Sequence, residues 1–467
     1  MMSYSGASNA YSGNLLRLLL FGFLLANLAC VLLSYLGHTM QPTMIGQFLT
    51  VHLKNVGDSW GTMAVAHEWL TTHPGGRVYQ AIFFDAHIRF QYPLTSLLLF
   101  KAIDLLPARP ESLLDLVSWY SIWAQSAVMG LVAVELAKRE GVAVARDRKI
   151  GIAVVTALMT LTFFPILRGF AIGQAQVWFD GFFFLACLFW LRGHWGRSGA
   201  MIGIICIFKP QLGLLLVWAV LRRNWGFAAG FLCVTVPAGL AALHFYGLRN
   251  NLDYLTVLGF LSRHGEIFYP NQSVNGLLSR FINPIDSRIW YGDSFPPYHP
   301  IVYYGTALSS AGLVLFGLLF RVRSEPRSFR SLLMAALAFT AASPIAWEHH
   351  YGILLPVLIC LAADASRLPW LREKAVRVLI FAASYVLVGQ DFFMIVMHLF
   401  PPNSLAYSFY FLAACGALAS LATFKAPLTA SSIQERISAP YRSTTTGGRA
   451  TQAFQPPDEG GRMGASV

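Results

Sequence analysis

The stretch NLLRLLLFGFLLANLACVLLSYL, residues 14–36, decides the fold class of this 467-residue chain. It is nearly all apolar, and about 20 such residues are enough to cross the hydrocarbon core of a bilayer. The apolar core of a signal peptide is shorter, roughly 7 to 15 residues, and no small-x-small cleavage site followed by a soluble domain is visible. We therefore expect these residues to form a first membrane span that is retained.

The rest of the chain continues this apolar pattern. Hydrophobic residues make up 56% of it and charged residues only 12%, whereas soluble proteins carry about 25% charged residues. The sequence thus predicts an all-α integral membrane protein with about twelve transmembrane helices. The predicted apolar segments lie at roughly 15–36, 92–106, 113–137, 150–167, 172–191, 199–221, 225–246, 301–320, 331–346, 351–363, 375–398 and 405–423.

The net charge of +12 does not indicate nucleic acid binding, because no basic patch interleaved with aromatic residues appears. Lys and Arg fall in short clusters between apolar segments, where they would lie beside anionic lipid head groups. All six cysteines lie inside apolar runs without metal-ligand spacing. We expect them to be small packing residues and expect no metal site.

The basic clusters predict the orientation in the membrane. Those at 222–225, 321–330 and 367–377 can share the cytoplasmic side. This arrangement leaves 37–91 and 247–300 as external loops.

The cluster at 137–149 fits less well, because simple alternation places it outside. Either segment 92–106 does not fully cross, or the charge rule fails here. Residues 1–424 would form the transmembrane domain. Residues 425–467, rich in Ser, Thr, Gly and Pro, would form a disordered cytoplasmic tail.

The first external loop places Asp58 just before an amphipathic pattern. From Ser59 to Leu70, the spacing of three and four residues predicts a helix with Trp60 and His67 on one face, together with Met63 and Ala64. Such a helix would lie along the membrane surface. Taken alone, Asp58 most simply caps this helix, a role worth about 1 kcal/mol. The alternative is a catalytic carboxylate.

The second external loop contains YPNQSVNGLLSR, residues 269–280. Asn271 is a possible glycosylation acceptor by its motif. The amides of Asn271 and Gln272 also suit sugar hydroxyls, because an amide side chain both donates and accepts hydrogen bonds. The motif ends at Arg280.

Within the apolar segments, Lys209 is an intramembrane cation, which is costly unless paired or hydrated. The stretch LRGFAIGQAQ (167–176) places Arg168, Gln174 and Gln176 around a break rich in Gly, although an ordinary loop with polar ends explains it equally well.

The stretch SPIAWEHHYG (343–352) carries His349 and His350. Adjacent residues point in different directions on a helix, so these imidazoles are not expected to chelate a metal together. A hydrogen bond to an anionic group is the better use for them.

Together these residues offer one carboxylate near the membrane surface, with cations and amides at membrane depth. Cations stabilise a phosphate leaving group as its bond breaks. A carboxylate within about 3 Å can deprotonate an acceptor hydroxyl. Sugar transfer from a lipid-phosphate donor needs both.

The order of the short motifs resembles glycosyltransferase family 87, over residues 15 to about 423. The motifs are Asp58 after the first span, FQYP (90–93), GQAQ (173–176), Lys209-Pro210 followed by RRNW (222–225), NQSVNGLLSR (271–280) and the histidine pair at 349–350. Two positions depart from the family pattern: Leu94 follows Pro93 where a second Pro is common, and Gln176 stands where Asn is common.

The resemblance implies the C-type glycosyltransferase fold, with external loops carrying juxtamembrane helices. It implies a polyprenyl-phosphate-linked donor of a hexose, expected to be mannose, a lipid or glycan acceptor, no metal and no cofactor. Transfer would be inverting, on the periplasmic or exterior face of the plasma membrane. Asp58 would be the general base. The donor- and acceptor-binding residues would be Lys209, His349, His350, Arg280, Asn271, Gln272, Gln174, Arg168 and Tyr92.

A membrane transporter is the main alternative, with Lys209 and the broken helices forming a midplane substrate site. A lipid-linked polymerase or ligase is a nearer alternative. Such enzymes usually depend on external loops rich in Arg, whereas 247–300 contains four arginines and no lysine.

Overall fold

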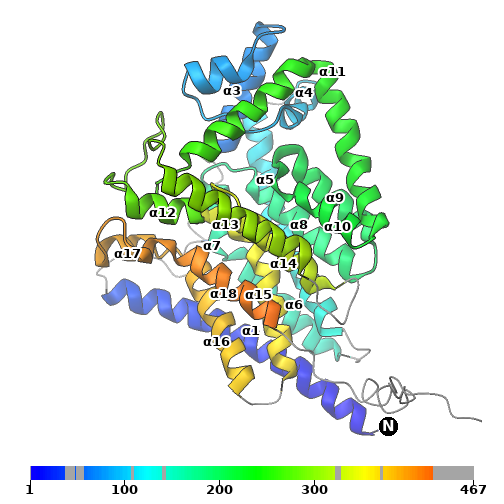
Figure 1. Ribbon diagram of the computed structural model, residues 1–467. Helices are drawn as coiled ribbons and strands as arrows, with labels where there is room; N and C mark the ends of the chain where they lie inside the picture. The colour runs from blue at the N-terminus through cyan, green and yellow to red at the C-terminus, as the bar shows by residue number, and fades with distance from the viewer. Residues whose placement is uncertain are drawn as a thin grey trace, which may run out of the picture. The chain divides into compact units, whose positions relative to one another are not determined.

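Helices form the whole of the described fold (Figure 1). The computed structural model describes residues 2–36, 48, 57–106, 110–138, 144–320, 328–368 and 372–423. These residues contain no β-strand and a single isolated bridge between Asn271 and Trp347. A helix satisfies its backbone groups internally, as a hydrocarbon environment demands. The predicted tail at 425–467 lies outside the described residues.

The α-helices follow one another along the chain with short connections. They are α1 (Met2–Leu36), α3 (Asp58–Thr72), α4 (Leu98–Ile103), α5 (Pro110–Lys138), α6 (Arg146–Leu161), α7 (Phe164–Ala171), α8 (Gln176–Leu191), α9 (Trp195–Phe208), α10 (Leu214–Leu221), α11 (Trp225–His264), α12 (Val274–Ile282), α13 (Pro300–Leu319), α14 (Phe329–Ala341), α15 (Leu354–Arg367), α16 (Arg372–Val388), α17 (Phe393–Leu399) and α18 (Phe409–Thr423). Short π or 3-10 segments are η1 (Tyr79–Asp85), η2 (Leu94–Leu97), η3 (Pro210–Gly213), η4 (Glu348–Ile353) and η5 (Leu405–Ser408).

Six helical segments of the described chain are long and apolar enough to cross a membrane. The number rises to eight if two bent pairs, α6 with α7 (43°) and α16 with α17 (88°), each count as one span. The expected total of about twelve therefore stays a prediction. Several apolar segments form helices of only 10–17 residues. At 1.5 Å per residue, these reach about 15–26 Å, short of a core about 30 Å thick.

The predicted segment 92–106 is one of these short elements. Its helical part covers Leu94–Ile103, which at 1.5 Å per residue is about 15 Å long. This length is half of a hydrocarbon core. Of the two explanations for the basic cluster at 137–149, the length favours the one in which 92–106 does not fully cross.

The predicted external loop 247–300 was wrong in its first part, because α11 continues through it as far as His264. Gly247 breaks the helix with φ 76° and ψ 160°, and the chain turns there (Figure 1). The second arm buries Tyr254, Val257 and Leu261 at helical spacing. Polar residues between these positions lower the mean hydropathy, so an argument based on apolar runs missed the helix.

The helices differ sharply in how much protein surrounds them. The span Glu348–Arg367, which includes η4 and α15, is 100% buried, whereas Trp225–His264 and Pro300–Leu319 are 22% and 17% buried. Every residue of α14 is also buried. The central helices are thus enclosed by protein, and the outer ones carry the apolar side chains that lipid can cover. The residues of η4 enter the site from this enclosed centre.

Candidate functional site

The predicted helix after Asp58 is confirmed as α3, which buries Trp60, Met63 and His67. Its first turn rests on the chain that follows α7. The Asp58 amide donates to the Ile172 carbonyl (2.8 Å), and the Ser59 amide donates to the Gly173 carbonyl (3.0 Å). Backbone groups that a helix start leaves unpaired are therefore satisfied by this turn.

The interpretation of Asp58 as the helix cap was wrong. Gly57 occupies the N-cap position in the left-handed conformation (φ 75°), and no side chain caps the helix. Asp58 is the first helical residue, and its carboxylate accepts a hydrogen bond from Gln174 instead. The carboxylate is therefore available for a role other than capping.

The turn under Asp58 is a Schellman motif that ends α7. The Gln174 amide donates to the Gly169 carbonyl (2.8 Å), and the Gly173 amide donates to the Phe170 carbonyl (3.0 Å). Gly173 has φ 70°, a conformation that a residue without Cβ adopts at little cost. The motif stops α7, and α8 starts two residues after Gln174, so Gln174 and Gln176 leave the same turn.

Gln174 orients the Asp58 carboxylate. Its Nε2 donates to Asp58 Oδ2 (2.5 Å), and its Oε1 accepts from Ser59 Oγ (2.6 Å). The Tyr92 hydroxyl lies 2.6 Å from Ser59 Oγ and 3.4 Å from Gln174 Oε1. With donors on its oxygen side, the amide can only present its NH2 group to Asp58.

The surroundings of Asp58 make it a stronger base than an ordinary aspartate. One side of the residue is exposed, but the surrounding protein desolvates the carboxylate and raises its pKa above the usual value. The Gln174 hydrogen bond and the charges of Lys209, Arg168 and Arg89 oppose this rise in pKa. A carboxylate that is raised in pKa and open on one side suits proton abstraction.

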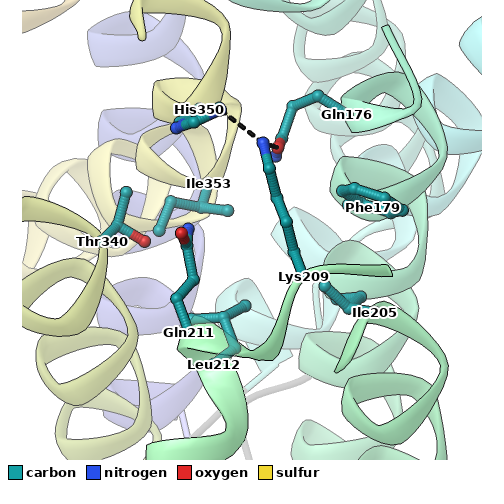
Figure 2. A pocket seen from close by; sticks show the side chains of 9 residues that line it. All are labelled: Gln176, Phe179, Ile205, Lys209, Gln211, Leu212, Thr340, His350 and Ile353. Carbon is teal, nitrogen blue, oxygen red and sulfur yellow. Dashed lines mark hydrogen bonds between the residues drawn. The ribbon is translucent and has the colours of Figure 1, made fainter. Parts of the chain in front are cut away.

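Lys209 lies at the break between α9 and η3. It is extended (φ −133°, ψ 99°), as the residue before a proline usually is. Figure 2 shows its side chain reaching between Gln176 and His350. Its Nζ is 3.1 Å from Gln176 Oε1 and is hydrogen-bonded to His350 Nε2. A cavity of about 10 Å³, room for about one water molecule, lies beside it.

Gln176 is held in turn by a buried carboxylate. Its Nε2 donates to Asp180 Oδ1 (2.9 Å), which directs its oxygen to Lys209. Asp180 is fully buried, and its Oδ2 has no hydrogen-bond partner among the described residues. A Cβ on Gly352 would overlap Asp180 Oδ2, so η4 packs directly on this carboxylate.

The NQS motif holds η4 in place. The Gln272 amide donates to the Ala346 carbonyl (2.7 Å), and the Glu348 amide donates to the Pro270 carbonyl (3.0 Å). The Asn271 side chain accepts from the Ala346 amide (3.0 Å). These bonds clamp the two segments together, so Asn271 and Gln272 support the segment that carries the histidines. Their predicted contact with a sugar stays a prediction.

Arg280 is buried in the same scaffold. Its guanidinium donates to the Asn271 carbonyl (3.0 Å) and to Ser408 Oγ (2.6 Å). Burial lowers the pKa of Arg280 to about 9, so the group stays cationic at neutral pH. In this structure it ties α12 to η5, and its predicted phosphate contact stays a prediction.

Two further predicted residues flank the Lys209 pair. Arg168 Nε donates to Glu348 Oε1 (3.1 Å), and the Arg168 side chain is 38% exposed. His349 is buried, and neither of its ring nitrogens has a hydrogen-bond partner in the described part of the chain. Both groups thus retain hydrogen-bonding capacity that a ligand could use.

Reasoning from the sequence missed Asp180 and Glu348 as site residues. Each is an acidic residue within an apolar segment, a signal that could have identified both. Ser59 was also missed, and nothing in its local sequence separates it from an ordinary helix residue. No group of three or more His, Cys, Asp or Glu among the described residues could hold a metal ion.

Comparisons with known proteins bear on this site. The sequence model of glycosyltransferase family 87 matches residues 90–344. The chain is 25% identical over 336 residues to the polyprenol-phosphate-mannose-dependent alpha-(1-2)-phosphatidylinositol mannoside mannosyltransferase of Mycobacterium tuberculosis (strain ATCC 25618 / H37Rv), covering 69% of this chain and 73% of the relative.

A second relative is the polyprenol-phosphate-mannose-dependent alpha-(1-2)-phosphatidylinositol pentamannoside mannosyltransferase of Mycobacterium tuberculosis (strain CDC 1551 / Oshkosh). It is 26% identical over 300 residues, which cover 63% of this chain and 64% of the relative. No solved structure is significantly similar to the chain.

Proposed function

The chain belongs to glycosyltransferase family 87, and from this premise we propose that it transfers mannose from a polyprenyl-phosphate-linked donor to a lipid or glycan acceptor. It is a glycosyltransferase with several apolar helices that can span a membrane. Both relatives are named as polyprenol-phosphate-mannose-dependent enzymes, and both names specify a phosphatidylinositol mannoside acceptor. These names support mannose as the sugar and a glycolipid as the acceptor class.

The observation that carries the proposal is the shared turn between Asp58 and Lys209. Gln174 bonds the Asp58 carboxylate, and two residues later Gln176 bonds the Lys209 amine. A base and a cation are thus held by one rigid element. Transfer from a phosphate donor needs such a pair, because a proton leaves the acceptor while negative charge grows on the phosphate.

The mechanism is a single inverting displacement. Asp58 takes the proton of the acceptor hydroxyl as its oxygen bonds to the anomeric carbon of the donor sugar. The bond between that carbon and the phosphate oxygen breaks, and its electron pair stays with the phosphate. Lys209 and His350, joined in the structure, bind the phosphate. One carboxylate suffices, unlike the two of a glycosidase, and the chemistry requires no metal or cofactor.

The remaining predictions belong to the same proposal. The fold is the C-type glycosyltransferase fold with about twelve crossings, some made by short or broken helices. The site opens to the periplasm or exterior of the plasma membrane, because α3 and the loop before it lie on the side opposite the basic clusters. Arg168, His349 and Tyr92 complete the surroundings of donor and acceptor.

The test is sugar transfer by membranes that contain the full chain and are supplied with radiolabelled polyprenyl-phosphate mannose and a phosphatidylinositol mannoside. We expect Asp58→Asn to lower the rate by about 10²–10⁴-fold, the usual contribution of a general base. Glu68→Gln is the matched control, because Glu68 is an exposed carboxylate on the same helix. Near wild-type transfer by Asp58→Asn would refute the assignment of Asp58.

A further inference from the structure

The hydrogen bonds of His350 determine where its ring proton lies. The Trp347 amide donates to His350 Nδ1 (3.2 Å). A backbone amide can only donate, so Nδ1 carries a lone pair and no proton. A neutral imidazole then carries its proton on Nε2. This nitrogen is the one that bonds Lys209.

The partner of Nε2–H must be an acceptor. A protonated lysine has three donors and no acceptor, whereas a neutral amine has two donors and one lone pair. The neutral amine satisfies every contact: its lone pair accepts from His350 Nε2–H, and one N–H donates to Gln176 Oε1. A protonated Lys209 would place two donors face to face.

The charges around Lys209 come from four elements. Asp180 faces it from α8 and Asp58 from α3, as their electrostatic interactions with it show. His349 and His350 face it from η4, and Arg168 lies beside His349 on α7. Gln211 of η3 and Thr340 of α14 line the same cavity and are neutral (Figure 2). A bound phosphate would add a negative charge in contact with the amine, which favours the ammonium form.

We propose that Lys209 is a neutral amine in the enzyme without donor, gains one proton from solvent as the donor phosphate binds, and gives that proton to the phosphate as the sugar leaves. This inference rests on the proposed function. It adds to the binding role of Lys209 a catalytic role as general acid.

The proton balance closes over one turnover. On binding, Lys209 becomes an ammonium ion, and His350 Nε2–H is released to donate to a phosphate oxygen. During transfer the acceptor proton moves to Asp58, and the phosphodiester becomes a phosphomonoester with a second acidic group of pKa about 6. The Lys209 proton moves to this monoester, which leaves as the hydrogen phosphate form. Lys209 is again neutral, and Asp58 returns its proton to solvent.

The test measures proton uptake on binding by isothermal titration calorimetry, with the full chain in nanodiscs and farnesyl methyl phosphate as the probe. This phosphodiester carries one fixed negative charge, so it contributes no proton change. Titrations at pH 8 in buffers of different ionisation enthalpy give the number of protons bound. We expect uptake of about one proton per probe, and a Kd that rises about tenfold per pH unit above neutrality.

Lys209→Arg keeps a cation that does not titrate. We expect this variant to bind the probe with no proton uptake and a Kd that is constant with pH, whereas a merely structural lysine would leave the proton count unchanged. Lys101→Arg is the matched control, since Lys101 contacts the ring of Phe245 on the kinked helix.

The outcomes separate the two proposals. Wild-type binding with no proton uptake and a constant Kd would overturn the general acid role and leave the proposed function standing. Failure of the probe to bind would overturn the donor assignment itself. If Lys209→Arg does not fold, the wild-type proton count alone decides.

Discussion

Replacing Gln174 by Leu tests whether the turn after α7 controls the catalytic carboxylate. The substitution removes the donor that lies 2.5 Å from Asp58 Oδ2 and the acceptor of Ser59 Oγ. A hydrogen bond to a charged group contributes about 1.5–3 kcal/mol. At 1.36 kcal/mol per tenfold change in rate, loss of the Asp58 bond should slow transfer by about 10- to 150-fold. The backbone of the turn is unchanged.

The same change should alter the pH dependence of the rate. The Gln174 hydrogen bond lowers the pKa of Asp58, so its removal raises that pKa further. A general base acts when deprotonated, so the acid limb of kcat/KM should move to higher pH. Gln125→Leu is the matched control, because Gln125 is a buried glutamine whose amide has no partner among the described residues.

The assay is the initial rate of mannose transfer between about pH 4.5 and 8.5, a range that brackets the titration of a carboxylate with a raised pKa, with thermal unfolding of each variant measured in parallel. A Gln174→Leu enzyme with the wild-type rate and an unmoved acid limb would refute the reasoning. A loss of rate accompanied by a large fall in Tm would indicate a structural role only.

Three further predictions concern the same region. Because desolvation raises the pKa of Asp58, the acid limb of wild-type kcat/KM should lie above the ordinary aspartate value of about 3.9. Gly352→Ala places a Cβ in overlap with Asp180 Oδ2 and should destabilise the protein by about 1–3 kcal/mol, seen as a lower Tm. Arg280→Met leaves the Asn271 carbonyl and Ser408 without this donor, so its Tm should fall, with activity lost in proportion to unfolding.

Each of these three has an outcome that contradicts it. An acid limb at or below about pH 4, the range of an ordinary aspartate, would show that Asp58 is not desolvated in the working enzyme. Gly416→Ala serves as the control for the glycine, because a Cβ there meets nothing within 4 Å; equal effects of the two alanines would exclude the packing explanation. A stable but inactive Arg280→Met would favour the phosphate contact that the family resemblance implies.

The sequence predicted those parts of the fold that depend on local pattern. The span at 14–36 and the helix after Asp58 follow from apolar runs and spacing, and both are present. The role of Asp58 did not follow, because the cap is supplied by the left-handed Gly57 and the partner by Gln174, which is 116 residues away in the chain.

Long-range contacts also account for what could not be predicted at the Lys209 site. His350 is 141 residues from Lys209, and no spacing rule joins them. The sequence identified both as unusual because polar groups in apolar segments are costly. It could not show that a turn at 173–176 links them to Asp58, since that requires the packing of α3 on the chain after α7.

The complete burial of η4 and α15 separates the reaction from the first ring of lipids. The lipid-facing arms of α11 and α13 are only 22% and 17% buried and can tilt when the bilayer becomes thinner or thicker. The histidines enter from a segment that touches protein on every side. Bilayer thickness therefore acts on the distance between base and phosphate only after the outer helices have transmitted it inward. One enzyme of this design can work in membranes of different lipid composition.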